Sequence, residues 1–464
     1  MRYLLSGYYG EKNAGDEAIL AGILQEIERR DPGARFTVLS FDPDDTEERH
    51  GRDRELVAIP TSLRSPRLLR TVMKGADLLI SGGGSFLHEA DFELHGRSFL
   101  FRQGKLRPVP YFLSIVLMAR ACGLPVMWYA QGLGPLHTRS ARRLTALAAS
   151  LSQALTWRDP DSARLAWQLG VRGPVQLVVP DPAYALSPAA PEEVDEVLKK
   201  LGLGRGGSGE GTQTRGHQAD RDRPPTGQQG GDWQQAQQVG PQAQGEEQGR
   251  PQVLPQSRRF LAVCPRPWLG RTGFLEALGK ALEEILLCLD LELLLVPFHE
   301  LQDPPVCETL AARPALAGRA HLLPLLASPA LLAGVLGAAE AVVAMRLHSG
   351  ILAAVAGTPA VVLDYDPKTR AFAAQTRQLA WAVSVDELER QGESLEAMSG
   401  PTAGSSRGAY SLLVEAVLDT LRHLPARRAA LARAVAPLRS DAGRTAALAV
   451  QLARSRGKLK AARA

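Results

Sequence analysis

The stretch that decides the fold is residues 340–368, EAVVAMRLHSGILAAVAGTPAVVLDYDPK. The apolar run 341–344 is long enough for a buried strand. Small residues predict a helix over 350–356, and 360–363 predicts a second buried strand. A strand, a helix and a strand in this order form the crossover unit of a parallel sheet. The stretch therefore predicts an α/β fold.

Positive side chains follow both predicted strands of this unit. Arg346 and His348 come directly after the first strand, and Lys368 follows the second. In open α/β sheets, ligands collect at the carboxyl ends of the strands, where helix N-termini favour anions. Two permanent cations and an imidazole at one rim suit a small anion that carries phosphate or carboxylate groups.

Length and composition are ordinary for a globular protein with more than one domain. The 464 residues are 45% hydrophobic and 22% charged, with a mild net charge of +5. Four cysteines lack the spacing of a metal site or a disulfide framework, which favours a reducing compartment. The N-terminus turns polar too quickly for a signal peptide, and no apolar run reaches the roughly 18 residues of a spanning helix. We expect a cytoplasmic protein with no nucleic-acid partner and at most a peripheral contact with the inner face of the membrane.

The alternation of strand and helix repeats along most of the chain. Strands are predicted at 3–7, 36–40, 76–81, 126–130, 154–157, 177–179, 260–264, 291–297, 341–344, 360–363 and 381–385. Helices are predicted at 18–30, 109–123, 140–153, 273–288, 328–338, 350–356, 408–422 and 425–454. Most predicted strands end in a glycine or polar cluster, which is typical of a doubly wound parallel sheet.

Residues 204–258 break this pattern. They are rich in Gly, Gln, Pro and mixed charges, so they bury too little apolar area to offset the entropy of ordering. We interpret them as a disordered insertion between domains, with an interaction arm as the alternative. The chain then divides into an N-terminal Rossmann-like domain at 1–203, the insertion, a second Rossmann-like domain at 259–405, and C-terminal helices with a basic tail at 406–464.

Two glycine-rich turns in the first half are candidate ligand contacts. Residues 7–17, GYYGEKNAGDE, join a strand to a helix but match neither the dinucleotide fingerprint nor the P-loop. Asp16 either faces a ligand or only caps this helix. Residues 82–84 are three glycines, which either let a ligand approach the backbone or serve tight packing.

Seven motifs occur in order along the two halves: GYYGEKNAGDEAIL, ISGGGSFLHE, YAQGLGP, TWRDPDS, CPRPW, MRLHSGILAAVAGTP and LDYDPK. Together they resemble the polysaccharide pyruvyl transferase family, and within it the bacterial cell-surface anchoring branch. The resemblance covers about residues 1–200 and 259–400 and leaves out the insertion. It implies two Rossmann-like, doubly wound domains that face each other across a cleft, as in glycosyltransferases of the GT-B type.

The resemblance also implies an activity. The family moves a pyruvyl group from phosphoenolpyruvate onto two hydroxyls of a sugar, which forms a ketal and releases phosphate. The acceptor would be an N-acetylmannosamine in a lipid-linked oligosaccharide or a cell-wall polysaccharide precursor, and the product would support anchoring of surface-layer proteins. No cofactor is implied, and no His, Asp or Glu cluster has metal-ligand spacing.

By the same resemblance, residues from both halves bind the phosphoenolpyruvate: Arg158, Arg346, Leu347, His348 and Lys368. Arginine forks onto a pair of oxyanions, whereas lysine supplies a point charge. The methylene carbon of the donor must be protonated. Histidine titrates near neutral pH, so His348 is the candidate general acid.

The base that accepts the proton of the sugar hydroxyl stays open between Asp16, Asp303 and Glu300. The candidate acceptor-binding residues follow strands, mostly in the first half: Asn13, Asp16, Gly83, Gly84, Ser85, Gln131 and Arg266.

Two other classes of protein would share this architecture. A sugar-nucleotide-dependent glycosyltransferase usually has a carboxylate in its second domain for the donor ribose, but none follows His348 before Asp364. A non-catalytic paralogue that binds a phospho-ligand would not need to keep Arg346, His348 and Lys368 together. Each of these residues could also have a purely structural role. Arg346 and Arg158 could form ion pairs, His348 could be a packed helix cap, and Lys368 could be a solvated side chain.

Overall fold

A computed structural model describes residues 1–61, 65–89, 101–102, 105–106, 108–204, 258–397 and 410–461. Nearly all of the predicted insertion at 204–258 lies outside these described residues, as does most of the junction between the second domain and the C-terminal helices.

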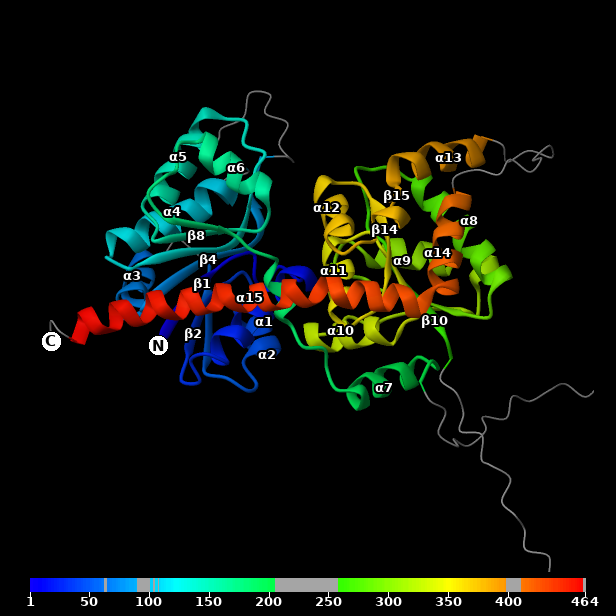
Figure 1. Ribbon diagram of the computed structural model, residues 1–464, viewed down its shortest axis with the longest axis horizontal. Helices are drawn as coiled ribbons and strands as arrows, with labels where there is room; N and C mark the ends of the chain where they lie inside the picture. Colours follow the sequence, from blue (N-terminus) through cyan, green and yellow to red (C-terminus); the bar gives the residue numbers. More distant parts are fainter. Residues whose placement is uncertain are drawn as a thin grey trace, which may run out of the picture.

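The first half of the chain forms a seven-stranded sheet in which every pairing is parallel (Figure 1). The strand order is β3-β2-β1-β4-β7-β8-β9. The strands are β1 (Arg2–Ser6), β2 (Arg35–Ser40), β3 (Leu56–Pro60), β4 (Leu78–Leu87), β7 (Val126–Leu133), β8 (Ala154–Trp157) and β9 (Val175–Val178). The chain winds from β1 to one edge and from β4 to the other, so this half is doubly wound, as predicted.

Helices cover both faces of this sheet because side chains of successive strand residues point to opposite faces. Tyr3 and Leu5 of β1 lie in one buried core with α1, and Leu4 lies in another with α4. The helices of this half are α1 (Ala14–Glu28), α2 (Pro43–His50), α3 (Pro66–Gly75), α4 (Pro108–Ala121), α5 (Arg139–Ser150) and α6 (Pro160–Gln168). A two-stranded pair, β5 (Phe101–Arg102) and β6 (Lys105–Leu106), precedes α4.

The second half forms a six-stranded parallel sheet of order β12-β11-β10-β13-β14-β15. Its strands are β10 (Phe260–Cys264), β11 (Glu292–Leu295), β12 (Ala320–Leu322), β13 (Ala341–Ala344), β14 (Ala360–Asp364) and β15 (Val383–Ser384). Its helices are α8 (Gly273–Cys288), α9 (Pro304–Ala311), α10 (Pro329–Ala338), α11 (Leu347–Val355), α12 (Pro367–Gln375), α13 (Val385–Ala397) and α14 (Tyr410–Arg422). The two-domain, doubly wound prediction is confirmed.

Two helices begin earlier than the sequence predicts, and this moves site residues into them. Helix α1 begins at Ala14 rather than at 18, because the side chain of Asn13 caps it by accepting from the amide of Gly15. Helix α11 begins at Leu347 rather than at 350. Asp16 and His348 therefore lie in the first turns of two helices.

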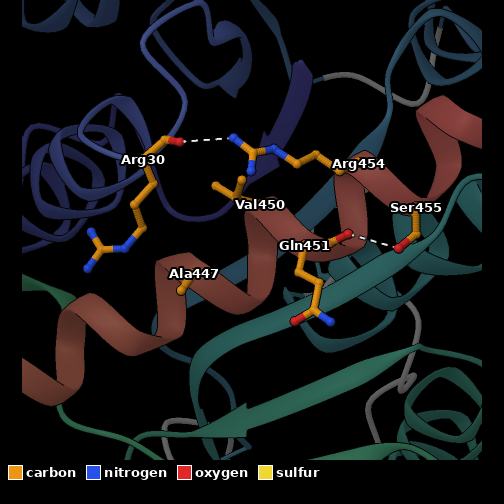
Figure 2. Close-up of a pocket in the computed structure, with 6 residues that line it drawn as sticks. All are labelled: Arg30, Ala447, Val450, Gln451, Arg454 and Ser455. Atoms are coloured by element: carbon orange, nitrogen blue, oxygen red, sulfur yellow. Dashed lines mark hydrogen bonds between the residues drawn. The ribbon is translucent and has the colours of Figure 1, made fainter.

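The last helix, α15 (Leu424–Ala461), runs across both halves of the molecule (Figure 1). Arg428 and Arg439 donate to the C-terminal carbonyls of α10 and α11 at 3.4 and 3.2 Å. Arg454 donates to the carbonyl of Arg30, just past the end of α1, at 3.1 Å (Figure 2). These carbonyls lack partners within their own helices and carry partial negative charge. Helix α15 therefore ties helix ends of both halves together.

A cavity of about 570 Å³ lies beside this contact with α1 (Figure 2). Its lining residues are Arg30, Ala447, Val450, Gln451, Arg454 and Ser455. Among the described residues, no helix combines the length and the apolar character needed to cross a bilayer.

Replacing Arg439 by leucine is expected to lower the free energy of unfolding by about 1–2 kcal/mol, because a charged donor to an α11 carbonyl is lost. Urea denaturation measures the loss. The control is Arg433→Leu on an exposed position of the same helix, expected to change the free energy by less than about 0.5 kcal/mol. Equal losses in the two variants would contradict this role of Arg439.

Candidate functional site

The loops that follow β1 and β11 join the two halves at the carboxyl ends of their sheets. The amide of Ala14 donates to the carbonyl of Phe298 at 2.8 Å, and the amide of Glu300 donates to the carbonyl of Lys12 at 3.0 Å. Arg49 forms an ion pair with Glu300 across the same junction. Glu300, a candidate base in the sequence, is thus engaged in holding the two halves together.

Side chains from both halves converge on Asp181. Arg158, directly after β8, donates Nη1 to Oδ2 of Asp181 at 3.1 Å. Nε2 of His348 lies 3.6 Å from the same oxygen. The Asp181 side chain is 3% exposed and caps the short helix η1 (Pro182–Ala185). Within the described part of the chain, Nε2 of His348 is buried and has no hydrogen-bond partner.

Two helix N-termini meet around the imidazole of His348. The residue lies in the first turn of α11, and the first turn of α1 packs directly against its ring. A Cβ atom on Gly15 would collide with Nδ1 of His348, so glycine is needed here. Because helix N-termini carry unpaired amides and partial positive charge, this position favours a bound anion.

Asp16 is a carboxyl group that changes its protonation state near neutral pH. Burial raises its pKa to about 7, although the charges of His348 and Arg158 oppose this rise. Nδ2 of Asn13 donates to Oδ2 of Asp16 at 2.7 Å. A perturbed carboxyl group within electrostatic reach of two cationic side chains is a candidate general base.

The pKa of the Asp181 carboxyl group is lowered, whereas that of Asp16 is raised. Burial alone would raise its pKa, but His348, Arg158 and the amide of Ala183 together lower it to about 2. Asp181 therefore stays ionised and places a fixed negative charge beside Arg158 and His348. The sequence pattern did not indicate that Asp181 belongs to the site. The available signal was an aspartate between two prolines directly after a predicted strand.

A buried pair holds the loop next to Asp16. Oε2 of Glu17 lies 2.8 Å from Nε2 of His50, and Oε1 accepts from the amide of Gly10 at 2.9 Å. Both side chains are almost fully buried. The pair fixes the turn between β1 and α1, and His50 was not predicted from the sequence.

Arg346 is held by a two-bond fork to Asp303. Nε donates to Oδ2 at 2.7 Å, and Nη2 donates to Oδ1. Asp303 is fully buried, and its Oδ2 also accepts from the amides of Phe298 and His299 at 2.9 Å each. These contacts make Asp303 a residue that orients Arg346, and they count against its prediction as the base.

Leu347 and Lys368 lie at the same edge of the second sheet in different surroundings. Leu347 opens α11 and packs against the buried core. Lys368 lies in the first turn of α12, with its side chain 41% exposed and Nζ 3.5 Å from Oδ2 of Asp366. Both remain predictions as donor-binding residues.

Two of the predicted acceptor residues lie behind the site. Gln131 is fully buried, and its Nε2 donates to the carbonyls of Gly84 and Gly132 at 3.1 and 2.8 Å. Gly83 has a φ of +77°, and a Cβ atom there would collide with Ile19 of α1. In this conformation both residues serve the packing of β4, which for Gly83 is the alternative that the sequence left open.

The other predicted acceptor residues lie nearer to the cationic side chains. Ser85 contacts Nη2 of Arg158 through its hydroxyl. Gly84 lies against Asp16: a Cβ atom at that position would be 3.4 Å from Oδ1. Arg266 lies at the edge of the second sheet, where its Nη1 donates to the hydroxyl of Tyr365 at 3.2 Å. Among the described residues, no three His, Cys, Asp or Glu side chains are grouped so as to hold a metal ion.

A family model described as polysaccharide pyruvyl transferase matches residues 13–367 of the 464-residue chain. The chain belongs to the polysaccharide pyruvyl transferase family. The resemblance of the motifs to this family is thereby confirmed, and membership makes the chain a transferase in its general function. The matched range of the pyruvyl transferase family includes Asp16, Arg158, Asp181, Arg346 and His348.

Solved structures similar to this pyruvyl transferase family member span nearly its whole length. UDP-GlcNAc 2-epimerase from Neisseria meningitidis, bound to UDP-GlcNAc, has 12% identity and a TM-score of 0.52, covering 97% of this chain and 100% of that chain. The glycosyltransferase SnogD from Streptomyces nogalater has 16% identity and a TM-score of 0.42, covering 97% and 99%. The epimerase similarity shows the GT-B type of fold and nothing further. No curated protein matches the chain.

Proposed function

We propose that the chain transfers the pyruvyl group of phosphoenolpyruvate to two hydroxyls of an N-acetylmannosamine residue in a cell-wall polysaccharide precursor. The observation that carries this proposal is the convergence on Asp181 of Arg158 from one half and His348 from the other. Arg346, held in place by Asp303, follows the same strand as His348, β13. A phosphate and a carboxylate on one small donor match several cations gathered at a junction of two sheets.

His348 is proposed as the general acid. Its Nε2 gives a proton to the methylene carbon of the donor, and the ionised Asp181 stabilises the charged imidazole beforehand. A sugar hydroxyl then attacks the cationic carbon, and the bond from that carbon to the phosphate oxygen breaks. The second hydroxyl closes the ketal. Of the two hydroxyl protons released, one passes through the base to the leaving phosphate and the other restores His348.

Asp16 is the base that the geometry favours. The other two candidate bases are already engaged in ion pairs, because Glu300 pairs with Arg49 and Asp303 pairs with Arg346. Asp16 lies within electrostatic reach of His348 and Arg158 and has a pKa of about 7. It is therefore substantially ionised at neutral pH and still basic enough to accept a hydroxyl proton.

The pH dependence of kcat/KM tests this role of Asp16. Because the ionised form acts as the base and its pKa is raised to about 7, kcat/KM is expected to rise with pH through 7. Asp16→Asn is expected to lower the rate by about 10²- to 10⁴-fold and to remove this rise. Asp44→Asn, at an exposed position of α2, is the control. A rise near pH 7 that persists in Asp16→Asn would exclude Asp16 as its source.

The function itself is tested by incubation with phosphoenolpyruvate and a β-N-acetylmannosamine-terminated acceptor. Phosphate release that depends on the acceptor, together with an acceptor mass increased by one pyruvyl ketal, is the expected result. Release of UDP from a UDP-sugar instead would favour the glycosyltransferase alternative. Binding of phosphoenolpyruvate without turnover would favour the non-catalytic alternative.

The cellular setting belongs to the same proposal. A lipid-linked acceptor at the inner face of the membrane would place the enzyme in the cytoplasm with a peripheral contact, and the product would support surface-layer anchoring. Helix α15 supports such a contact, because Arg433 and Arg444 are exposed on a helix with one acidic residue, Asp441. Exposed arginines of this kind attract anionic lipid.

A further inference from the structure

Trp268 and Tyr365 form an aromatic pair at the rim of the second sheet. Trp268 follows β10 and Tyr365 follows β14, while Arg346 follows β13, which lies between these two strands. The strands are in register at this edge, with Cys264 opposite Ala344 and Ala344 opposite Val362. The pair therefore flanks the strand end that presents Arg346.

The two rings meet edge to face and are only partly buried. Their centroids are 4.4 Å apart with an angle of 62° between the planes. Both side chains rest on the buried core of the second half and keep part of their surface open to solvent. In an edge-to-face pair, one ring keeps both of its faces free of its partner.

Arg266 lies close to both the aromatic pair and Arg346. Its guanidinium carbon lies 5.4 Å from the centroid of each ring. Burial lowers the pKa of His299, and the charges of Arg346 and Arg266 lower it further, so both arginines lie within electrostatic reach of this histidine. The aromatic pair and Arg346 thus belong to one rim.

We infer that Trp268 and Tyr365 form a platform on which the pyranose ring of the acceptor stacks, with Arg266 donating to its hydroxyls. The inference deepens the proposed function and rests on it for the identity of the sugar. The apolar C–H face of a pyranose fits the negative face of an aromatic ring, and a few polar groups then fix its orientation. Phosphoenolpyruvate has no such ring, so a platform of this kind serves the acceptor rather than the donor.

The chain offers a matched control for this pair. Trp167 is 60% exposed near the end of α6, and the guanidinium of Arg172 lies 3.3 Å from its ring centroid. Helix α6 begins at the carboxyl end of β8, so its last turn lies toward the opposite edge of the first sheet. Trp167 is therefore also an indole ring next to an arginine, but it lies away from the strand end that presents Arg346.

The test compares Trp268→Ala, Trp268→Phe and Trp167→Ala in two measurements. In turnover with saturating phosphoenolpyruvate, Trp268→Ala is expected to raise the KM of a β-N-acetylmannosamine-terminated disaccharide about tenfold. The Kd of phosphoenolpyruvate should change less than about twofold, because the ring leaves the donor-binding cations in place. Trp268→Phe, which keeps an aromatic face and the packing beneath it, should recover most of the acceptor affinity. Trp167→Ala should behave as the unmodified chain does.

The second measurement is saturation-transfer NMR with the same disaccharide and no donor. The unmodified chain and Trp167→Ala should show transfer to the sugar, and Trp268→Ala should lose most of it. Equal transfer in all three proteins, or no transfer in the unmodified chain, overturns the platform. A Trp268→Ala variant that loses affinity for UDP and not for the disaccharide also overturns it. If the sugar binds in a way that depends on Trp268 but no phosphate is released, the proposed reaction is wrong, whereas the role of the aromatic platform in sugar binding is supported.

Discussion

Replacing His348 with alanine is expected to lower the rate of ketal formation by about 10²- to 10⁴-fold and to leave the Kd of phosphoenolpyruvate within a few fold. The imidazole supplies the proton that the methylene carbon needs, whereas Arg158 and Arg346 carry most of the charge that holds the donor. Single-turnover phosphate release and a binding titration separate the two quantities.

The control for this substitution is His321→Ala. His321 is half-buried on β12, where its Nε2 pairs with Glu292 at 3.2 Å, and it has no part in the proposed site. Its replacement should leave turnover unchanged. If His348→Ala keeps the turnover of the unmodified chain, His348 is not the acid.

Replacing Arg346 with leucine is expected to have two large effects at once. It removes the partner of the fully buried Asp303, which should lower the free energy of unfolding by about 3–5 kcal/mol. It also removes a cation from the donor site, so phosphoenolpyruvate binding should be lost. Chemical denaturation measures the first effect and a titration with phosphoenolpyruvate measures the second.

A double variant separates stability from binding. Arg346→Leu combined with Asp303→Asn removes the unpaired buried charge, so it should recover part of the lost stability without recovering donor affinity. Arg346→Lys restores the charge without the two-bond fork and should bind the donor more weakly than arginine does. Donor binding at the unmodified affinity in Arg346→Leu would remove this residue from the site.

The sequence predicted the two parallel sheets because their strands are short apolar runs bounded by glycine and polar clusters. That signal is local, and β10, β13 and β14 lie where the pattern put them or within a residue of it. Helix starts were less predictable. The start of α1 depends on capping by Asn13. Helices α2, α6 and α12, which begin at prolines, were not predicted at all.

The site could be predicted only as far as charge and strand position allow. Arg158, Arg346 and His348 follow strands, and the structure places them at one junction. Asp181 was missed because its importance comes from long-range contacts with Arg158 and His348. Asp303 stayed one of three candidate bases in the sequence because its position there shows neither its burial nor its fork with Arg346.

The proposed reaction requires cationic side chains from both halves to bind one small phosphorylated three-carbon acid in front of His348. A crystal structure with phosphoenolpyruvate tests this most directly. We expect donor density in contact with Arg158 and Arg346, with the methylene carbon about 3–3.5 Å from Nε2 of His348. Donor density bound away from these side chains, or with its methylene carbon turned from the imidazole, would contradict it.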